Sequence, residues 1–356
     1  MDLKLIDISA IKKAQKNIEE IVIRTPFNKN SNYSNKFKAN IFFKREDLQK
    51  VKSFKIRGAF NKISLLNSKV IQNNIVCASA GNHAQGVAQS CKMLNLFGSI
   101  FMPVNTPNQK VNQVKKIGNN NIEVVLIGDN YDESHNAAIS FCQSNNQTYV
   151  HPFDDMDIIT GQGTLFLEII QQFPKQLDYL FVPIGGGGMI SGAISVFKQL
   201  SPNTKIIGIE PAGAPAMKNS LENGKNITLD SIDIFVDGAS VKRVGEISFK
   251  FCKEYLDDII VIDEGEICQN LIDLHKNENI WVEPAGAMSV SALRKYSDKI
   301  IGKNIACIIC GANNDESRMP EIEKKALIWN DHINTLLNLN GNKDYYSNLF
   351  PKPILL

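Results

Sequence analysis

A lysine, a run of four glycines and a loop of small polar residues are the parts of this sequence best suited to chemistry. Lys55 stands between Phe54 and Ile56 in the stretch SFKIRG. Burial beside such apolar neighbours would lower the pKa of its amine and allow it to attack a carbonyl. Charged residues crowd the preceding segment, KRED at 44–47, so an ordinary exposed lysine is the alternative.

The glycines Gly185, Gly186, Gly187 and Gly188 follow the apolar run DYLFVPI and precede a helix-like segment that begins at Met189. A bare backbone between a strand and a helix exposes N–H groups that bind an anion, and the helix N-terminus adds positive potential. Neither G-x-x-x-x-G-K-[ST] nor G-x-G-x-x-G is present here. The run therefore favours a compact phosphate monoester over a nucleotide.

A second loop runs through Ser79, Ala80, Gly81, Asn82 and His83, after the β-like run NIVCA and before a helix. Its exposed N–H groups suit a carboxylate, and Asn82 offers a directional donor. A Ser/Asn helix cap is the competing interpretation, with His83 as a plain helix-start residue. Together, the lysine, the phosphate cup and the carboxylate loop are the parts that pyridoxal phosphate chemistry requires.

Composition and net charge limit the classes of protein to which these motifs can belong. The chain has 356 residues, 43% of them hydrophobic, and a formal net charge of +2, which gives no electrostatic push toward nucleic acid or anionic membranes. The N-terminal segment resembles an amphipathic helix rather than a signal or transit peptide, so we expect a cytoplasmic protein. Seven cysteines, an odd number, fit a reducing compartment. The C-x-x-C pair of Cys307 and Cys310 is interpreted as two small residues of a buried strand rather than as a redox or zinc pair.

Short β-rich runs alternate with helix-length segments, which predicts an α/β fold with two open, twisted, mostly parallel sheets flanked by helices. The expected strands are 39–43, 74–78, 98–102, 122–126, 179–183, 205–209, 258–262 and 305–310. The expected helices are 58–66, 84–94, 109–117, 131–142, 163–172, 190–200, 266–276 and 285–295. Beyond Asn330 the alternation stops, and we expect the last residues, 338–356, to form an irregular tail.

Four motifs in this order and at these separations, SFKIRGA, ASAGNHAQGVA, PIGGGGMISG and CGANN, resemble the threonine/serine dehydratases of the fold-type II pyridoxal-phosphate enzymes, whose fold is that of the tryptophan synthase β-subunit. The similarity runs from about Arg24 to Arg318. It includes KREDLQ, GQGTLFLEI, DGASVKRVGE, EYLDDII and EPAGA.

The resemblance implies roles for individual residues. Lys55 would bind the cofactor covalently and act as the catalytic base, next to Phe54. Asn82 would contact the phenolic oxygen of the cofactor ring, Cys310 would face its pyridine nitrogen, and Gly185 to Met189 would hold its phosphate. Ser79, Ala80, Gly81, Asn82 and His83 would receive the substrate carboxylate. Glu210 and the carbonyl of Ala214 would begin a monovalent or divalent cation site.

The implied reaction is deamination of L-threonine to 2-oxobutanoate and ammonia, with L-serine giving pyruvate as a second substrate. A thiol at Cys310 is a weak donor, which favours elimination over transamination. Alternatives are a serine racemase or another β-elimination or replacement enzyme, and a non-catalytic pyridoxal-phosphate or amino-acid binding protein. Ala80 argues against a racemase, because the resembling racemases carry a proton-transferring serine there.

The resemblance also implies an organisation. A large cofactor-binding domain would comprise residues 1–74 and 151–320, and residues 75–150 would form a small inserted domain. Residues 321–356 would form a C-terminal helix and tail, without the regulatory domain of the isoleucine-inhibited members. A homodimer or homotetramer acting on a small amino acid is expected, with no nucleic-acid or membrane partner.

Overall fold

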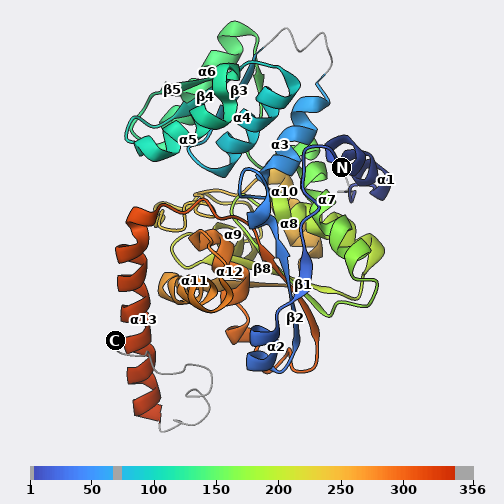
Figure 1. Cartoon of the computed structure of the whole chain (residues 1–356), viewed down its shortest axis with the longest axis vertical. Helices are drawn as coiled ribbons and strands as arrows, with labels where there is room; N and C mark the ends of the chain where they lie inside the picture. Colours follow the sequence, from blue (N-terminus) through green and yellow to red (C-terminus); the bar gives the residue numbers. More distant parts are fainter. Residues whose placement is uncertain (1–3, 67–73, 341–356) are drawn as a thin grey trace.

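Two β-sheets, each flanked by helices, form the framework of the computed structural model, which describes residues 4–66 and 74–340 (Figure 1). The six-stranded sheet has the order β1-β2-β10-β7-β8-β9, and the four-stranded sheet has the order β5-β4-β3-β6. We propose that the two sheets define the large and small domains expected from the sequence.

The larger sheet is parallel except for its edge pair β1–β2, which is antiparallel. Its strands are β1 (Phe27–Lys29), β2 (Asn40–Arg45), β7 (Tyr179–Pro183), β8 (Lys205–Pro211), β9 (Asp258–Ile262) and β10 (Asn304–Ile309). Parallel strands end at the same edge of a sheet, and ligands bind outside those carboxyl ends. The segments after β2, β7 and β10, which contain the predicted lysine, glycine run and cysteine, therefore meet at one edge.

The smaller sheet is parallel throughout. Its strands are β3 (Ile75–Ala78), β4 (Gly98–Met102), β5 (Ile122–Leu126) and β6 (Thr148–Tyr149). The carboxylate loop predicted at 79–83 directly follows β3, so it occupies the equivalent edge of this second sheet.

Helices cover both sheets. Around the smaller sheet these are α4 (Asn82–Leu94), α5 (Asn108–Gly118) and α6 (Tyr131–Asn145). The others are α1 (Ile8–Ile18), α2 (Ser31–Phe37), α3 (Lys55–Ser64), α7 (Met156–Gln172), α8 (Gly188–Leu200), α9 (Ala216–Glu222), α10 (Glu246–Tyr255), α11 (Glu264–Glu278), α12 (Pro284–Ser291) and α13 (Met319–Asn340). Short 3-10 turns are η1 (Glu46–Leu48), η2 (Asn119–Asn121), η3 (Arg294–Tyr296) and η4 (Glu316–Arg318). Helix α3 packs against both α4 and α7, so it joins the two halves of the molecule.

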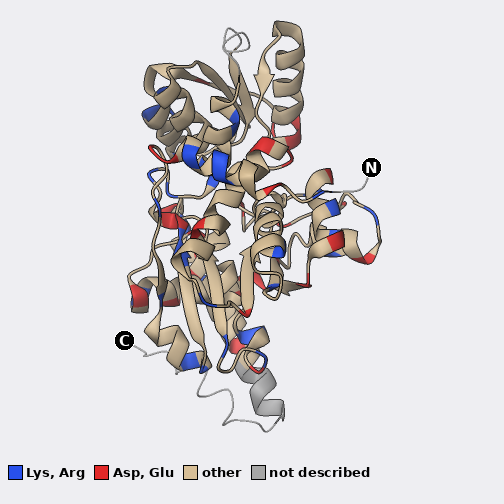
Figure 2. Cartoon of the chain, turned by 90° about the vertical axis from the view of Figure 1, so that its right-hand side faces the viewer, with Lys and Arg blue, Asp and Glu red and all other residues tan. Residues whose placement is uncertain are grey.

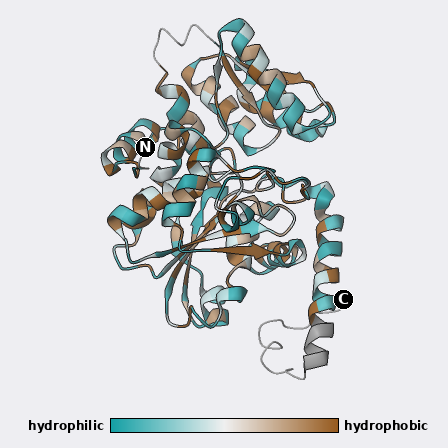
Figure 3. Ribbon diagram, turned by 180° about the vertical axis from the view of Figure 1, so that it is seen from behind, coloured by the Kyte–Doolittle hydropathy of each residue, from teal (hydrophilic) through white to brown (hydrophobic). Residues whose placement is uncertain are grey.

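The hydrophobic core follows the central strands, which Figure 3 shows as brown segments between the helices. Strand β7 is buried from Leu180 to Pro183, and β8 is buried from Ile206 to Pro211. Parallel strands covered on both faces form such continuous apolar runs, which is why they stood out in the sequence. The smaller sheet has a separate core, which includes Ile75, Val87 and Ile100.

A cluster of buried charges anchors α3. The Arg57 cluster consists of Lys44, Glu46, Arg57 and Glu168. Arg57 donates from Nε and Nη2 to Glu46 and from Nη1 and Nη2 to Glu168, at 2.8–3.0 Å. Lys44 donates to Glu168 at 2.6 Å. These ion pairs tie α3 to η1 and α7, and so fix the helix that begins with Lys55.

Most expected elements are confirmed, and the differences have simple causes. The strands at 98–102, 122–126, 179–183 and 258–262 have the bounds expected for them. Strands β1 and β6 were missed because runs of three and two residues show no periodicity. Helices α2, α9 and α10 were also not anticipated.

The expectation of an irregular tail over residues 338–356 is wrong at its start, because α13 continues to Asn340. The apolar spacing of Ile333, Leu336 and Leu337 continues a helical pattern that was overlooked. The rest of the expected tail lies outside the described residues.

Charges of both signs are interspersed over the elements that Figure 2 presents. Among the described helices, none combines the length and the hydropathy needed to cross a bilayer.

Candidate functional site

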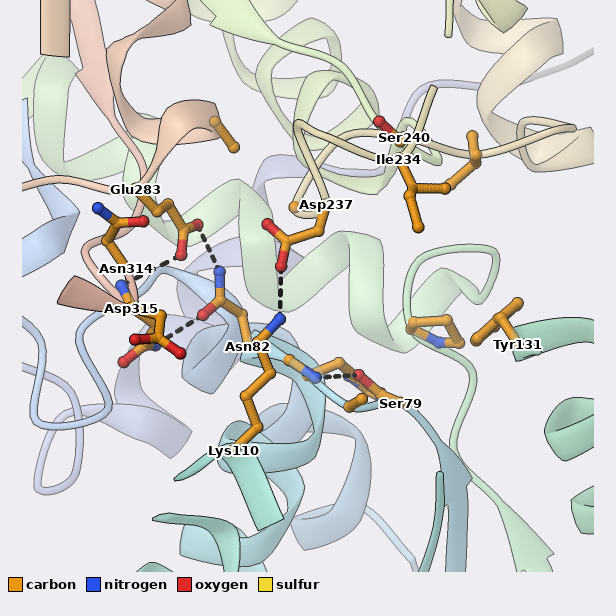
Figure 4. Close-up of a pocket in the computed structure, with 18 of the residues that line it drawn as sticks. Ser79, Asn82, Lys110, Tyr131, Ile234, Asp237, Ser240, Glu283, Asn314 and Asp315 are labelled. Carbon is orange, nitrogen blue, oxygen red and sulfur yellow. Dashed lines mark hydrogen bonds and ion pairs between the residues drawn. The ribbon is translucent and has the colours of Figure 1, made fainter. Parts of the chain in front are cut away.

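A cleft of about 1900 Å³ lies at the carboxyl ends of both sheets. Its wall includes the segments after β3 and β10, the start of α3, and the 228–243 part of the connection between α9 and α10. Figure 4 shows part of this wall, where Asn82, at the start of α4 beside the smaller sheet, faces Glu283, which precedes α12 beside the larger sheet. The predicted lysine, cysteine and carboxylate loop therefore meet in one place, although they are up to 255 positions apart in sequence.

Lys55 occupies the first position of α3 and faces the cleft. Its Nζ donates to the carbonyl of Pro152 at 2.8 Å and lies 5.5 Å from the centre of the Phe54 ring. Burial lowers the pKa of the amine to about 8, although Cys310 and Glu283 act in the opposite direction. With this lowered pKa, the amine of Lys55 can act as a base near neutral pH.

Backbone bonds fix the approach to Lys55. The N–H of Phe54 donates to the carbonyl of Cys310 at 3.1 Å, and that of Ala312 donates to Lys52 at 2.8 Å. On the other side, Gly86 of α4 faces the lysine's own peptide, since a Cβ there would lie 3.3 Å from its carbonyl carbon and oxygen. The lysine backbone is therefore held between the end of β10 and helix α4.

The predicted carboxylate loop ends at the N-terminus of α4. The N-cap residue is Gly81, and no side chain caps the first turn of the helix. The Ser/Asn cap is thus not realised, and Ser79 instead accepts the N–H of Gly81 at 3.2 Å. Uncapped N–H groups at a helix start that lines a cleft suit an anionic group.

His83 is buried, and its Nε2 bonds to the carbonyl of Val150 at 2.9 Å. Burial, with a contribution from the Lys55 charge, lowers its pKa to about 3. The imidazole is therefore neutral, with the proton on Nε2, and it supports the loop rather than exchanging protons.

Asn82 is held by two residues for which the sequence suggested no role. Its Nδ2 donates to Oε1 of Glu283 at 2.6 Å, and its Oδ1 accepts from Nδ2 of Asn313 at 2.6 Å (Figure 4). Burial raises the pKa of Glu283 to about 7, and the nearby Asp237 adds to this effect. Glu283 and Asn313 lie in the quoted motifs EPAGA and CGANN, which were the available signal. They fix which atoms of Asn82 face the cleft.

The segment from Gly185 to Met189, here called the glycine cup, encloses a small cavity of about 40 Å³ next to the cleft. One water molecule needs roughly 10–15 Å³ by the same measure, so a group of a few heavy atoms fits. A Cβ at Gly186 would collide with the ring of Phe153, and Gly187 adopts φ +94°. Helix α8 begins in the cup without a side-chain cap. These features leave backbone N–H groups facing a space of phosphate size.

Cys310 lines both the cleft and the small cavity. Burial raises the pKa of its thiol well above the usual value, and Sγ donates to the carbonyl of Ala285 at 3.3 Å. A neutral thiol at this place is a weak donor.

The predicted cation ligands do not join this group. Both carboxylate oxygens of Glu210 accept backbone N–H groups, from Met217 at 2.7 Å and Lys218 at 2.9 Å. Burial raises the pKa of Glu210 to about 7. Among the described residues, no cluster of three or more His, Cys, Asp or Glu side chains is arranged to hold a metal ion. A cation at Glu210 and Ala214 remains a prediction.

The site combines three features: a buried lysine with a lowered pKa, a glycine cup of phosphate size, and an uncapped helix start that suits a carboxylate. Together they define a site for a phosphorylated carbonyl cofactor that acts on amino acids. The comparisons agree. Residues 18–311 match the family model described as "Pyridoxal-phosphate dependent enzyme". The chain belongs to this family of pyridoxal-phosphate enzymes.

Individual relatives extend the comparison. The chain is 49% identical over 324 residues to a protein of Halalkalibacterium halodurans named L-threonine dehydratase biosynthetic IlvA, an alignment that covers 91% of this chain and 78% of that protein. Among solved structures, the processed threonine deaminase isoform 2 of Solanum lycopersicum is 35% identical with a TM-score of 0.85, covering 92% of this chain and 93% of the other. Maize serine racemase is 30% identical with a TM-score of 0.83, covering 92% and 100%. The fold is therefore that of fold-type II pyridoxal-phosphate enzymes, as expected.

Proposed function

We propose that this chain is a threonine ammonia-lyase, which converts L-threonine to 2-oxobutanoate and ammonia and accepts L-serine as a second substrate. The observation that carries the proposal is the position of Lys55. Its amine, with a pKa lowered to about 8, faces the cleft. The uncapped start of α4 lines the same cleft. The likeness to proteins named threonine dehydratase and threonine deaminase supports the choice of substrate.

The residues divide the work as follows. The loop from Ser79 to His83, which leads into α4, binds the substrate carboxylate through backbone N–H groups. Lys55 then removes the proton from the α-carbon, which is efficient because its pKa lies near the operating pH. Pyridoxal phosphate, when bound, supplies the electron-accepting ring that stabilises the negative charge left on that carbon. Loss of the β-hydroxyl as water and later addition of water leave the 2-oxo acid and ammonia.

The geometry around the cofactor favours elimination. Asn82, oriented by Glu283 and Asn313, retains one Nδ2 hydrogen for the phenolic oxygen of the ring. The neutral thiol of Cys310 does not supply the strong charge partner that would stabilise a long-lived carbanion.

Racemisation is the second candidate reaction, because a serine racemase is among the similar structures. Ala80 argues against it. Ala80 lines the cleft at the place where the resembling racemases carry a serine, and its methyl group transfers no proton. We also place the protein in the cytoplasm as a homodimer or homotetramer. The seven cysteines, all buried and unpaired, are consistent with a reducing compartment.

The decisive experiment incubates the purified protein and pyridoxal phosphate with L-threonine or L-serine and measures ammonia and 2-oxo acid. Stoichiometric release of both products from threonine is expected. A chiral assay of the remaining serine distinguishes a racemase, which would produce D-serine. If neither amino acid yields a product, the binding-protein alternative replaces this proposal.

A further inference from the structure

The small cavity at the glycine cup contains one side-chain amide that no role yet explains. The cavity is lined by the glycine cup and, among others, by Lys55 and Gln162. Among the described residues that line the cavity, these two alone supply side-chain N–H donors, and the lysine amine is committed to the cofactor's aldehyde. Gln162 belongs to GQGTLFLEI, a motif that the site described above leaves without a function.

Gln162 is buried and incompletely satisfied. The residue is 1% exposed, and its Oε1 has no hydrogen-bond partner among the residues that the structure describes. A phosphate dianion accepts hydrogen bonds and donates none, so it would be bound by the NH₂ group of this amide and not by its oxygen. A half turn about the last side-chain bond exchanges the oxygen and the NH₂ group, so the amide can present either to the cavity.

The helices around Gln162 are shaped to hold it in place. A Cβ at Gly58 would collide with Nε2 of Gln162, so the fourth residue of α3 must be glycine to admit the amide. Gly58 lies three residues after Lys55, hence on the same side of α3. A Cβ at Gly192 of α8 would likewise collide with the backbone of Gln162 and Gly163. The amide is therefore wedged between the lysine helix and the helix that begins in the cup.

We propose that the side-chain amide of Gln162 binds the cofactor's phosphate, adding one side-chain N–H donor to a cup otherwise made of backbone N–H groups. A phosphate dianion without an arginine or a second lysine in its cavity gains from each neutral donor. This inference rests on the cofactor of the family and not on the choice of amino-acid substrate, so it stands or falls separately from the proposed function.

The test compares two cofactors that differ only in the phosphate. Apoprotein binding of pyridoxal phosphate and of pyridoxal is titrated for the wild type, for Gln162→Leu and for Gln162→Asn. Loss of a hydrogen bond to a charged group weakens binding by roughly tenfold to a hundredfold. That loss is expected for pyridoxal phosphate in Gln162→Leu, with pyridoxal unaffected. Gln171→Leu, which changes an exposed glutamine of the same helix, is the matched control and leaves both affinities unchanged.

Equal losses for both cofactors would assign Gln162 a packing role, and unchanged affinities would show that it makes no contact; either result overturns the proposal. A measurement on the wild type guards against a variant that fails to fold. The ¹⁵N side-chain resonance of Gln162 is expected to shift on addition of pyridoxal phosphate and to stay in place with pyridoxal. Identical responses to the two compounds would contradict the inference.

Discussion

The Arg57 cluster, which anchors α3, and the glycine cup, in which α8 begins, use polar groups in opposite ways. In the Arg57 cluster every carboxylate meets a guanidinium or ammonium group, at 2.6–2.8 Å. Among the described residues that line the small cavity at the cup, none is acidic. The cup offers backbone N–H groups, and the nearby amide of Gln162 has an oxygen with no partner in the described part of the chain.

The difference separates support from function. Paired buried charges leave nothing for a ligand to satisfy, so their role is to hold α3 in register with η1 and α7. Open donors in a space of phosphate size gain a partner only when a ligand enters. Changes in the cluster should therefore alter the free energy of unfolding, and changes near the cup should alter chemistry and cofactor binding.

The largest expected effect is on chemistry. Replacing Lys55 with alanine would remove the proposed base and the proposed covalent attachment of the cofactor, so product formation should fall by at least about 10³-fold. The free energy of unfolding should change little, because only a desolvated amine is lost. Steady-state assays with urea unfolding measure both quantities. Lys50→Ala, at an exposed lysine, is the control. More than a tenth of the original activity in Lys55→Ala would contradict the role of the amine.

A change in the Arg57 cluster should do the reverse. Arg57→Met leaves Glu46 and Glu168 as buried carboxylates without their main partner, which costs about 3–5 kcal/mol of unfolding free energy. Burial opposes ionisation of Glu46, but Arg57, together with Lys44 and Thr25, lowers the pKa of that carboxyl. The midpoint of urea unfolding gives the measurement. Adding Glu168→Gln to Arg57→Met should recover part of the loss, whereas a simple sum of two losses would show that the charges are not coupled.

The pH dependence of cofactor capture tests the electrostatics of the cleft. Only the neutral amine attacks the aldehyde, so capture by the apoprotein should rise with pH and reach its midpoint near 8, the lowered pKa of Lys55. The charge of Glu283 raises that pKa, so Glu283→Gln should move the midpoint to lower pH. Stopped-flow absorbance at fixed cofactor concentration follows the reaction. A midpoint near that of free lysine would mean that the amine is exposed to solvent.

The smallest effect is expected at a surface ion pair, which provides the scale for the others. Lys218 and Glu222 face each other one turn apart on α9 at 3.8 Å, and both are exposed. Lys218→Ala should change the unfolding free energy by no more than about 0.5 kcal/mol. A loss as large as that of Arg57→Met would remove the contrast between buried and exposed pairs.

The sequence predicted what depends on local pattern. Strands β7 and β9 were placed because they are apolar and short, and the glycine cup because four glycines between a strand and a helix have few other uses. The roles of Glu283 and Gln162 were not predictable in this way. Glu283 meets Asn82 across 201 positions, and Gln162 reaches Gly58 only when α7 packs against α3. Such pairs depend on the tertiary arrangement, which no local window of sequence contains.

The contact at Gly86 has a consequence for engineering this enzyme. The first turn of helix α4 lines the cleft, and one turn later Gly86 packs against the peptide of Lys55. The predicted carboxylate loop and the backbone of Lys55 are therefore both positioned by helix α4. Redesign of the loop for another amino acid should therefore leave glycine at position 86, because even a methyl group there would make a tight contact with the carbonyl group of Lys55 and displace its backbone.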